Sequence, residues 1–151
     1  MKFLSTILVA TAVATGAITL GFATQSQAQD AAAAVKARVA LMKGNGAAAA
    51  RINKAEDAKA TVEDAKSIQA NLAKVGELWP AGSITPDSRA KPEIWTNMDD
   101  FKAKLAAAQK EAATLVATTE KGDLAAIKAQ VPQLVNACNA CHKTYRAPAK
   151  Q

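Results

Sequence analysis

Two cysteines and a histidine near the carboxyl end of the chain form its most chemically informative pattern. They stand in Cys138-Asn139-Ala140-Cys141-His142, a C-x-x-C-H sequence, which is typical of covalent attachment of c-type haem. Two thiols three residues apart on one helical turn can add to the two vinyl groups of a porphyrin, and the next residue can present its imidazole to the iron. The pattern therefore predicts one covalent haem c, with Cys138 and Cys141 as thioethers and His142 as the proximal iron ligand.

Other uses of these three side chains fit the sequence less well. A disulfide is the common use of two cysteines in an exported chain, but their spacing and the adjacent histidine favour haem. A thioredoxin-like C-x-x-C pair opens a helix after a strand, and no strand is expected before Cys138. A structural zinc ion takes four donors, whereas the chain offers two thiols and one imidazole.

Methionine is the expected source of a sixth iron ligand. His142 is the only histidine in the chain, so ligation by two histidines of one molecule is excluded. Met42 and Met98 are the candidates once Met1 leaves with the signal segment described below. Met42 lies on the expected inner face of the first helix and is the better candidate, because Met98 stands at the entrance to the third helix. The alternative for Met42 is a core methionine that fills an irregular gap.

The amino-terminal segment has the pattern of a secretory signal peptide. Lys2 precedes an apolar run from Phe3 to Phe22, and small residues lead to Ala28, an arrangement typical of such signals. We expect cleavage after Ala28, export to the periplasm and no membrane association afterwards. Residues 1–28 are then the signal peptide and residues 29–151 one domain with one core.

The remaining sequence predicts helices in nearly all of its length. It is rich in Ala, Lys, Leu, Val and Glu, and only 4% of the whole chain is aromatic. Four amphipathic segments with short connections and one long crossover predict an all-α fold, a four-helix bundle. The helices are expected at about 30–53, at about 57–74, from Asn97 or Asp99 to a turn at 120–123, and from a cap at Asp123 through Cys141, with Pro132 kinking or restarting the last one.

The charge of the chain limits the kind of partner it is expected to bind. The formal net charge is +6 at pH 7 and is spread along the sequence without a basic block. Such a balance favours a solvated surface or an acidic redox partner over nucleic acid, so no nucleic-acid partner is expected.

Beyond the haem motif, the chain resembles the class II c-type cytochromes, the family that includes cytochrome c′ and the low-spin cytochrome c-556. The resemblance covers residues 29–151, and its most specific element is the position of the motif near the carboxyl end, within 138–146. Supporting elements are Arg38-Val-Ala-Leu-Met42, Leu78-Trp-Pro80 and Lys91-Pro-Glu-Ile-Trp95. It implies an up-and-down four-helix bundle with covalently bound haem c between the first and last helices.

The same resemblance implies roles for single residues. Arg38 is expected beside the haem propionates, whose carboxylates suit its guanidinium, and Arg146 is expected beside His142. Met42 is expected to face the open side of the iron, where a methionine binds the metal in the low-spin branch but only shields a vacant site in cytochrome c′. Val39 stands where many members have glutamine, so a polar contact to the haem edge is expected to be missing.

Two functions follow from these expectations. The first is electron transfer with redox partner proteins, the iron being held by His142 and Met42. The second is binding of a diatomic gas, nitric oxide or carbon monoxide, at five-coordinate iron. The run from Leu41 to Gly46 favours the low-spin branch and hence the first function. An enzyme is not expected, because no acid-base group is apparent beside the haem, and the chain is expected to be a monomer or a homodimer.

Overall fold

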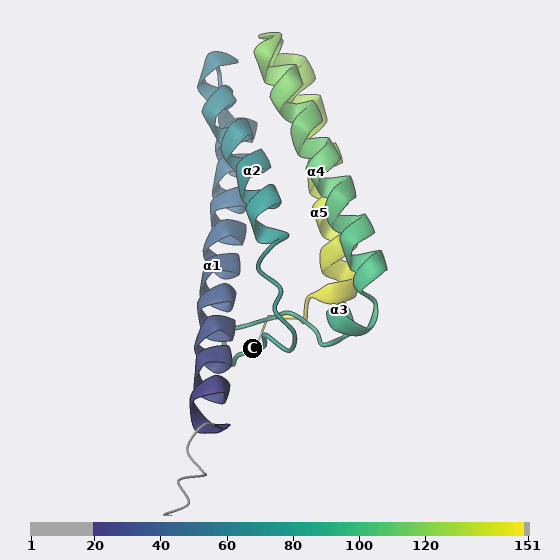
Figure 1. Ribbon diagram of the computed structural model, residues 1–151. Coiled ribbons are helices and arrows are strands. Elements are labelled where there is room, and N and C mark those ends of the chain that lie inside the picture. Colours follow the sequence, from purple (N-terminus) through teal and green to yellow (C-terminus); the bar gives the residue numbers. More distant parts are fainter. Residues whose placement is uncertain (1–19, 150–151) are drawn as a thin grey trace, which may run out of the picture.

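Four long helices run side by side and form the body of the molecule (Figure 1). The computed structural model describes residues 20–149. Its elements are α1 (Leu20–Lys54), the 3-10 turn η1 (Lys59–Thr61), α2 (Val62–Val75), α3 (Glu93–Thr96), α4 (Met98–Glu120) and α5 (Leu124–Tyr145). Within these residues there is no strand, only an isolated bridge between Ala90 and Arg146. The predicted all-α, up-and-down four-helix bundle is confirmed.

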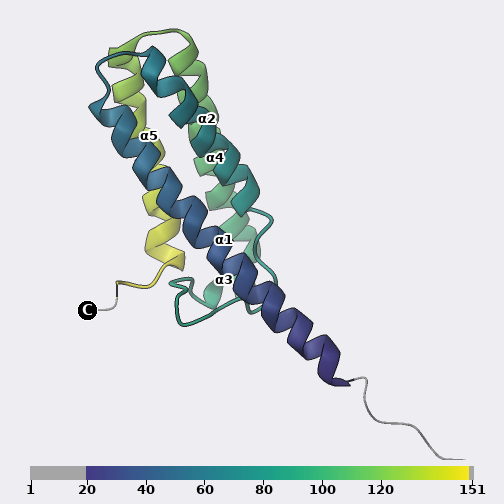
Figure 2. The same ribbon diagram turned by 90° about the vertical axis from the view of Figure 1, so that its left-hand side faces the viewer.

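The helices pack as two close pairs, α1 with α2 and α4 with α5. Contacts between α2 and α4 join the two pairs. The crossover between α2 and α4, which contains the short helix α3, lies at the same end of the bundle as the carboxyl end of α5 (Figures 1 and 2). The short turns after α1 and α4 lie at the opposite end. The C-x-x-C-H motif and the crossover are thereby brought together.

Helix α1 begins earlier than the sequence predicts, at Leu20 instead of near Asp30. It passes through the predicted cleavage point after Ala28 without a break. The rest of the predicted signal peptide, residues 1–19, lies outside the described part of the chain. Between residues 20 and 149, no helix combines the length and apolarity needed to cross a bilayer.

The main core lies between the four long helices and consists of aliphatic side chains. One face of α2 contributes to it through Ala65, Ile68, Leu72 and Val75, which are buried, whereas Val62 on the same face is half-buried. Burial of this apolar surface is the principal stabilising contribution to such a bundle. Its fully or almost fully buried members are Ala48, Ile52, Ala65, Ile68, Leu72, Ala108, Ala112, Leu115, Ile127 and Leu134.

A second, aromatic cluster holds the crossover against the bundle. Phe101 of α4 meets Trp79 with ring centroids 4.7 Å apart and Tyr145 of α5 at 5.3 Å, both edge to face. Ile94 of α3 is buried in the same cluster. Such aromatic pairs add to the free energy of area burial, so the long crossover is fixed although it has little regular structure.

The two predicted amino-terminal caps differ in outcome. Asp123 caps α5, since its carboxylate accepts a hydrogen bond of 3.0 Å from the backbone N–H of Ala126. Asn97 precedes α4, but its side chain makes no capping bond. Its amide donates instead to the carbonyl of Glu93 at 3.2 Å, which also accepts a hydrogen bond of 3.0 Å from the backbone N–H of Asn97 at the end of α3. Pro132 neither ends nor restarts α5, which is continuous through it.

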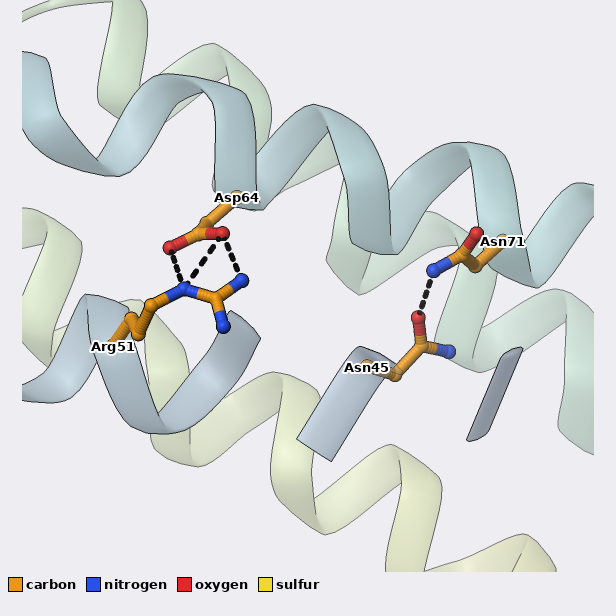
Figure 3. A network of polar contacts seen from close by, with 4 residues as sticks. All are labelled: Asn45, Arg51, Asp64 and Asn71. Carbon is orange, nitrogen blue, oxygen red and sulfur yellow. Dashed lines mark hydrogen bonds and ion pairs between the residues drawn. The ribbon is translucent and has the colours of Figure 1, made fainter. Parts of the chain in front are cut away.

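Two polar contacts join α1 to α2 (Figure 3). Arg51 binds the carboxylate of Asp64 through Nη2 at 2.5 Å and Nε at 2.9 Å, and Asn71 donates to Asn45 at 2.9 Å. The Arg51 side chain is 62% exposed, so solvent screening leaves the ion pair with a small contribution. These contacts link the two helices and add little to the stability of the pair.

Gly46 offers a test of helix stability in α1. A β-carbon at Gly46 would meet no atom within 4 Å, and one at Gly44 would meet only the Asn71 amide at an ordinary 3.5 Å. The neighbouring side chains therefore leave room for a β-carbon at both positions, and packing within the chain does not require glycine there. We expect Gly46→Ala to raise the free energy of unfolding by about 0.5–1 kcal/mol, because alanine loses less backbone entropy in a helix.

Urea denaturation of the haem-loaded protein would measure this gain. Gly82→Ala is the matched control and should lower stability, since Gly82 has a φ of +67° that strains any residue with a β-carbon. A stability loss in Gly46→Ala would contradict the prediction.

Candidate functional site

A cavity of about 1020 Å³ lies at the crossover end of the bundle. It lies between α1 and α5, which separate toward this end in Figure 2. This volume is at the upper end of the range for small-molecule and cofactor sites. Its walls include Val35, Val39 and Met42 of α1, Thr85 and residues 87–90 of the crossover, Phe101 and Leu105 of α4, and Cys141, His142 and Tyr145 of α5.

The aliphatic residues and the methionine of the α1 wall differ in exposure. Val35 is buried, whereas Val39 and Met42 are half-buried. Met98, the other candidate sulfur ligand, does not line this cavity and lies in a separate hollow of about 220 Å³. Of the two methionines, only Met42 therefore shares a cavity with His142.

The three residues of the haem motif occupy the last two turns of α5. Both thiols are free and half-buried. Cys141 and His142 line the cavity, whereas Cys138 packs one turn away against the main core. The structure thus brings Cys141, His142 and Met42 together and leaves Cys138 at the edge of the group.

Burial governs the protonation of these side chains. Desolvation, followed by the neighbouring Cys138, raises the pKa of the Cys141 thiol to about 11, and desolvation also raises the pKa of Cys138. The pKa of His142 is lowered by burial and then by the positive charges of Arg146 and Arg89. A neutral imidazole at pH 7 keeps a lone pair for a metal.

Arg38 is a buried cation, with 4% of the residue exposed. Its Nη1 donates to the Leu78 carbonyl at 2.6 Å and to Ser83 Oγ at 2.7 Å, and its Nη2 donates to the Ser83 carbonyl at 2.6 Å. The guanidinium also lies 4.0 Å from the ring centroid of Trp79. No carboxylate of residues 20–149 pairs with it, and burial lowers its pKa. Since Arg38 lines the cavity, a ligand carboxylate there would supply the missing anion.

Ser83 was not expected as a site residue, because a lone serine in a crossover has no periodic signal. It is fully buried and accepts from Arg38 through both its hydroxyl and its carbonyl.

We expect Ser83→Ala to lower the free energy of unfolding by about 1–3 kcal/mol, because a buried guanidinium N–H loses its partner. Chemical denaturation would measure the loss, and Ser67→Ala, at an exposed position of α2, should cost much less. Equal effects of the two substitutions would contradict a role for Ser83 in holding Arg38.

The end of α5 is tied to the crossover on the side of His142. The Ala147 N–H donates to the Arg89 carbonyl at 2.7 Å, and Arg89 Nε donates to the Ala147 carbonyl at 2.8 Å. Arg146, the predicted neighbour of His142, is exposed and lines the cavity. Arg89 was missed by sequence reasoning, because its nearness to His142 results from contacts across the whole chain.

Tyr145 fastens the same turn of α5 to α4. Its hydroxyl donates to Asp100 Oδ2 at 2.5 Å. This hydrogen bond is the largest of the causes that raise the pKa of Tyr145 to about 12, and it is also the main reason why the pKa of Asp100 is lowered. The turn that carries His142 is therefore held from both the crossover and α4.

The donor set suits an iron porphyrin better than a bare metal ion. Within the described part of the chain, no group of three or more His, Cys, Asp or Glu side chains could hold a metal. A porphyrin supplies four nitrogen ligands itself and needs only axial ligands and anchors. One imidazole, one thioether, two thiols and a buried arginine around a largely apolar cavity meet that need.

The chain is similar to known proteins in both sequence and structure. A family model described as Cytochrome C′ matches residues 30–146. The cytochrome c-556 of Agrobacterium tumefaciens (strain II Chrys) is 36% identical over 118 residues, which are 74% of this chain and 95% of that protein. Cytochrome c prime from Shewanella frigidimarina has a similar structure, with a TM-score of 0.72, 26% identity and coverage of 78% of this chain and 97% of that one.

A nitric oxide complex of a cytochrome c prime variant from Alcaligenes xylosoxidans is also similar, with a TM-score of 0.69 and 26% identity. It covers 76% of this chain and 94% of that one.

Proposed function

Because the chain belongs to the cytochrome c′ family and carries one covalently attached haem c, we propose that it is a periplasmic electron-transfer protein whose iron is bound by His142 and Met42. The bound haem supplies an iron centre that exchanges one electron between its ferrous and ferric states. The protein is a carrier in this proposal and catalyses no further reaction.

Six residues hold the haem in this proposal. Cys138 and Cys141 anchor it through thioether bonds, and His142 and Met42 are the iron ligands. Arg38 and Arg146 face its carboxylates and its proximal side. The support is their placement, since all of them except Cys138 line the one cavity, and Cys138 lies one helical turn from Cys141.

The observation that carries the proposal is that Met42 and His142 line the same cavity from two different helices, α1 and α5. Both helices are held by core packing, so both ligands can stay in place in the two oxidation states. A thioether ligand favours ferrous iron and raises the reduction potential. The similarity to cytochromes named c-556 also supports this function.

A second candidate function is binding of nitric oxide or carbon monoxide. It is favoured by the similarity to a cytochrome c prime variant solved as a nitric oxide complex. In this case Met42 shields a vacant iron position without binding it, and the apolar side chains Val35 and Val39 of α1 line the gas pocket with it.

The visible absorption spectrum of the haem-loaded protein decides between the two functions. Electron transfer with His142 and Met42 as ligands predicts a sharp α-band in the reduced form and a methionine-to-iron charge-transfer band in the oxidised form. A broad high-spin spectrum that shifts on addition of carbon monoxide would contradict this proposal and support the second function.

Export is part of the proposal and has a test of its own. Amino-terminal sequencing of the periplasmic protein should begin at Gln29, which would leave α1 as a helix starting at about that residue. Retention of residues 1–28 in the protein from that compartment would contradict cleavage after Ala28.

A further inference from the structure

Four basic side chains around the cavity have no acidic partner. Lys36 and Lys43 of α1, Arg89 of the crossover and Arg146 beyond α5 all belong to its lining. Within residues 20–149, none of the four forms an ion pair. Asp87 is the single acidic residue of the lining. The charges at this place are therefore mostly positive and uncompensated.

The two lysines flank apolar side chains in the part of the lining that α1 contributes. They are seven residues apart, which is two helical turns or about 10.5 Å along the axis. Both are exposed, and the less exposed Val39 lies between them on the same stripe. Their ammonium groups can therefore reach solvent while the apolar side chains of α1 face the cavity.

Arg89 places a positive charge on the other side of the cavity. Its Nε is fixed to the Ala147 carbonyl at 2.8 Å, so the side chain is held next to the end of α5. Arg89 and Arg146 line the same cavity as His142. Positive charge thus comes from both the α1 side and the α5 side.

The haem does not neutralise this charge. It brings two propionates, and the buried Arg38 without a carboxylate partner is a natural counter-ion for one of them. Even with both propionates ionised, the cations of the lining outnumber the anions. Unpaired charges of one sign around a redox centre steer oppositely charged molecules toward it.

We propose that Lys36, Lys43 and Arg89 form the docking face for a redox partner protein whose contact surface is acidic. The inference rests on the proposed electron-transfer function and specifies the chemistry of the partner. In each encounter one electron passes between the two centres, so one is oxidised as the other is reduced, and no proton or group is transferred.

The soluble domain of cytochrome b5, an acidic one-electron haem protein, can serve as the probe. Isothermal titration of the haem-loaded protein with it at low salt would measure the dissociation constant. The double variant Lys36→Glu with Lys43→Glu should weaken binding by about tenfold or more. The rate at which the ferrous probe reduces this double variant, measured by stopped flow, should also fall. That rate should lose most of its dependence on ionic strength.

A second double variant separates the docking face from net charge. Lys110→Glu with Lys128→Glu makes the same change of charge at exposed positions of α4 and α5 that do not line the cavity. Binding should then weaken by about twofold at most, as expected for distant screened charges. Equal losses in the two double variants would overturn the proposal.

Anionic vesicles containing phosphatidylglycerol test the other class of acidic surface. The protein should not sediment with them at physiological salt. Sedimentation that depends on Lys36 and Lys43, together with unchanged binding of cytochrome b5, would assign the face to a membrane surface and overturn the proposal.

The visible spectrum of each variant keeps this test apart from that of the proposed function. A low-spin spectrum with no effect of the lysine substitutions overturns the docking face alone. A high-spin, carbon monoxide-binding spectrum overturns the electron-transfer function, whatever the lysines do.

Discussion

Replacing both Cys138 and Cys141 by serine is expected to abolish the haem signal that survives denaturing electrophoresis. The hydroxyl of serine does not form the thioether bonds by which the two thiols anchor the porphyrin, so haem would be lost when the fold is lost. The expected effect is complete, because these are the only cysteines in the chain. Haem staining of protein made in cells with an active maturation system is the measurement.

Each single cysteine variant should retain one anchor and hence a weaker signal. Thr144→Ser is a suitable control, since Thr144 is exposed on the same end of α5 and its hydroxyl is conserved by the change. A full signal in the double variant would refute attachment at Cys138 and Cys141. A colourless wild-type protein, with both thiols free or joined to each other, would refute covalent haem in this chain.

Met42→Ala is expected to convert six-coordinate iron into iron that accepts an external ligand. Removal of the thioether opens one coordination position, so the methionine-to-iron charge-transfer band should disappear and the ferrous form should bind carbon monoxide readily. The shorter side chain should also lower stability by about 2 kcal/mol, because apolar contacts in the cavity wall are lost. Absorption spectra with and without carbon monoxide are the measurement.

Met98→Ala is the matched control for this substitution. Met98 is also half-buried and packs against the aromatic cluster, but it lies outside the cavity that contains His142. It should lower stability to a similar extent and leave the spectrum unchanged. An unchanged low-spin spectrum in Met42→Ala would show that Met42 is not the ligand. Loss of the low-spin spectrum in Met98→Ala would indicate that Met98 is the ligand.

Much of the fold follows from patterns that span only a few residues. The helical spacing of Val62, Ala65, Ile68, Leu72 and Val75 predicts the buried face of α2; the structure buries the last four and leaves Val62 half-buried. Asp123 is a correct cap, because its bond reaches only to Ala126. Asn97 has the same kind of side chain, yet it turns to the preceding helix α3, which the sequence pattern did not predict.

The candidate site likewise has one part that a local pattern predicts and another that depends on tertiary structure. The C-x-x-C-H motif is local, so the haem and its proximal histidine can be predicted from one helical turn. The sequence favours Met42 over Met98, but only the placement of α1 and α4 shows that Met42 shares a cavity with His142 and Met98 does not. Both methionines have the same chemistry, and spacing alone left the role of Met42 open.

By itself, then, the sequence determined the helical class of the chain, its attachment motif and its family resemblance, because each depends on side chains close together along the chain. Only the tertiary structure decided that Arg38 is held by Ser83, 45 positions away, and that Arg89 is fastened to Ala147, 58 positions away. Such contacts join an irregular crossover to distant helices. Their energy comes from burial and hydrogen bonding between segments that no periodic pattern relates, so they exist only once the whole bundle has packed.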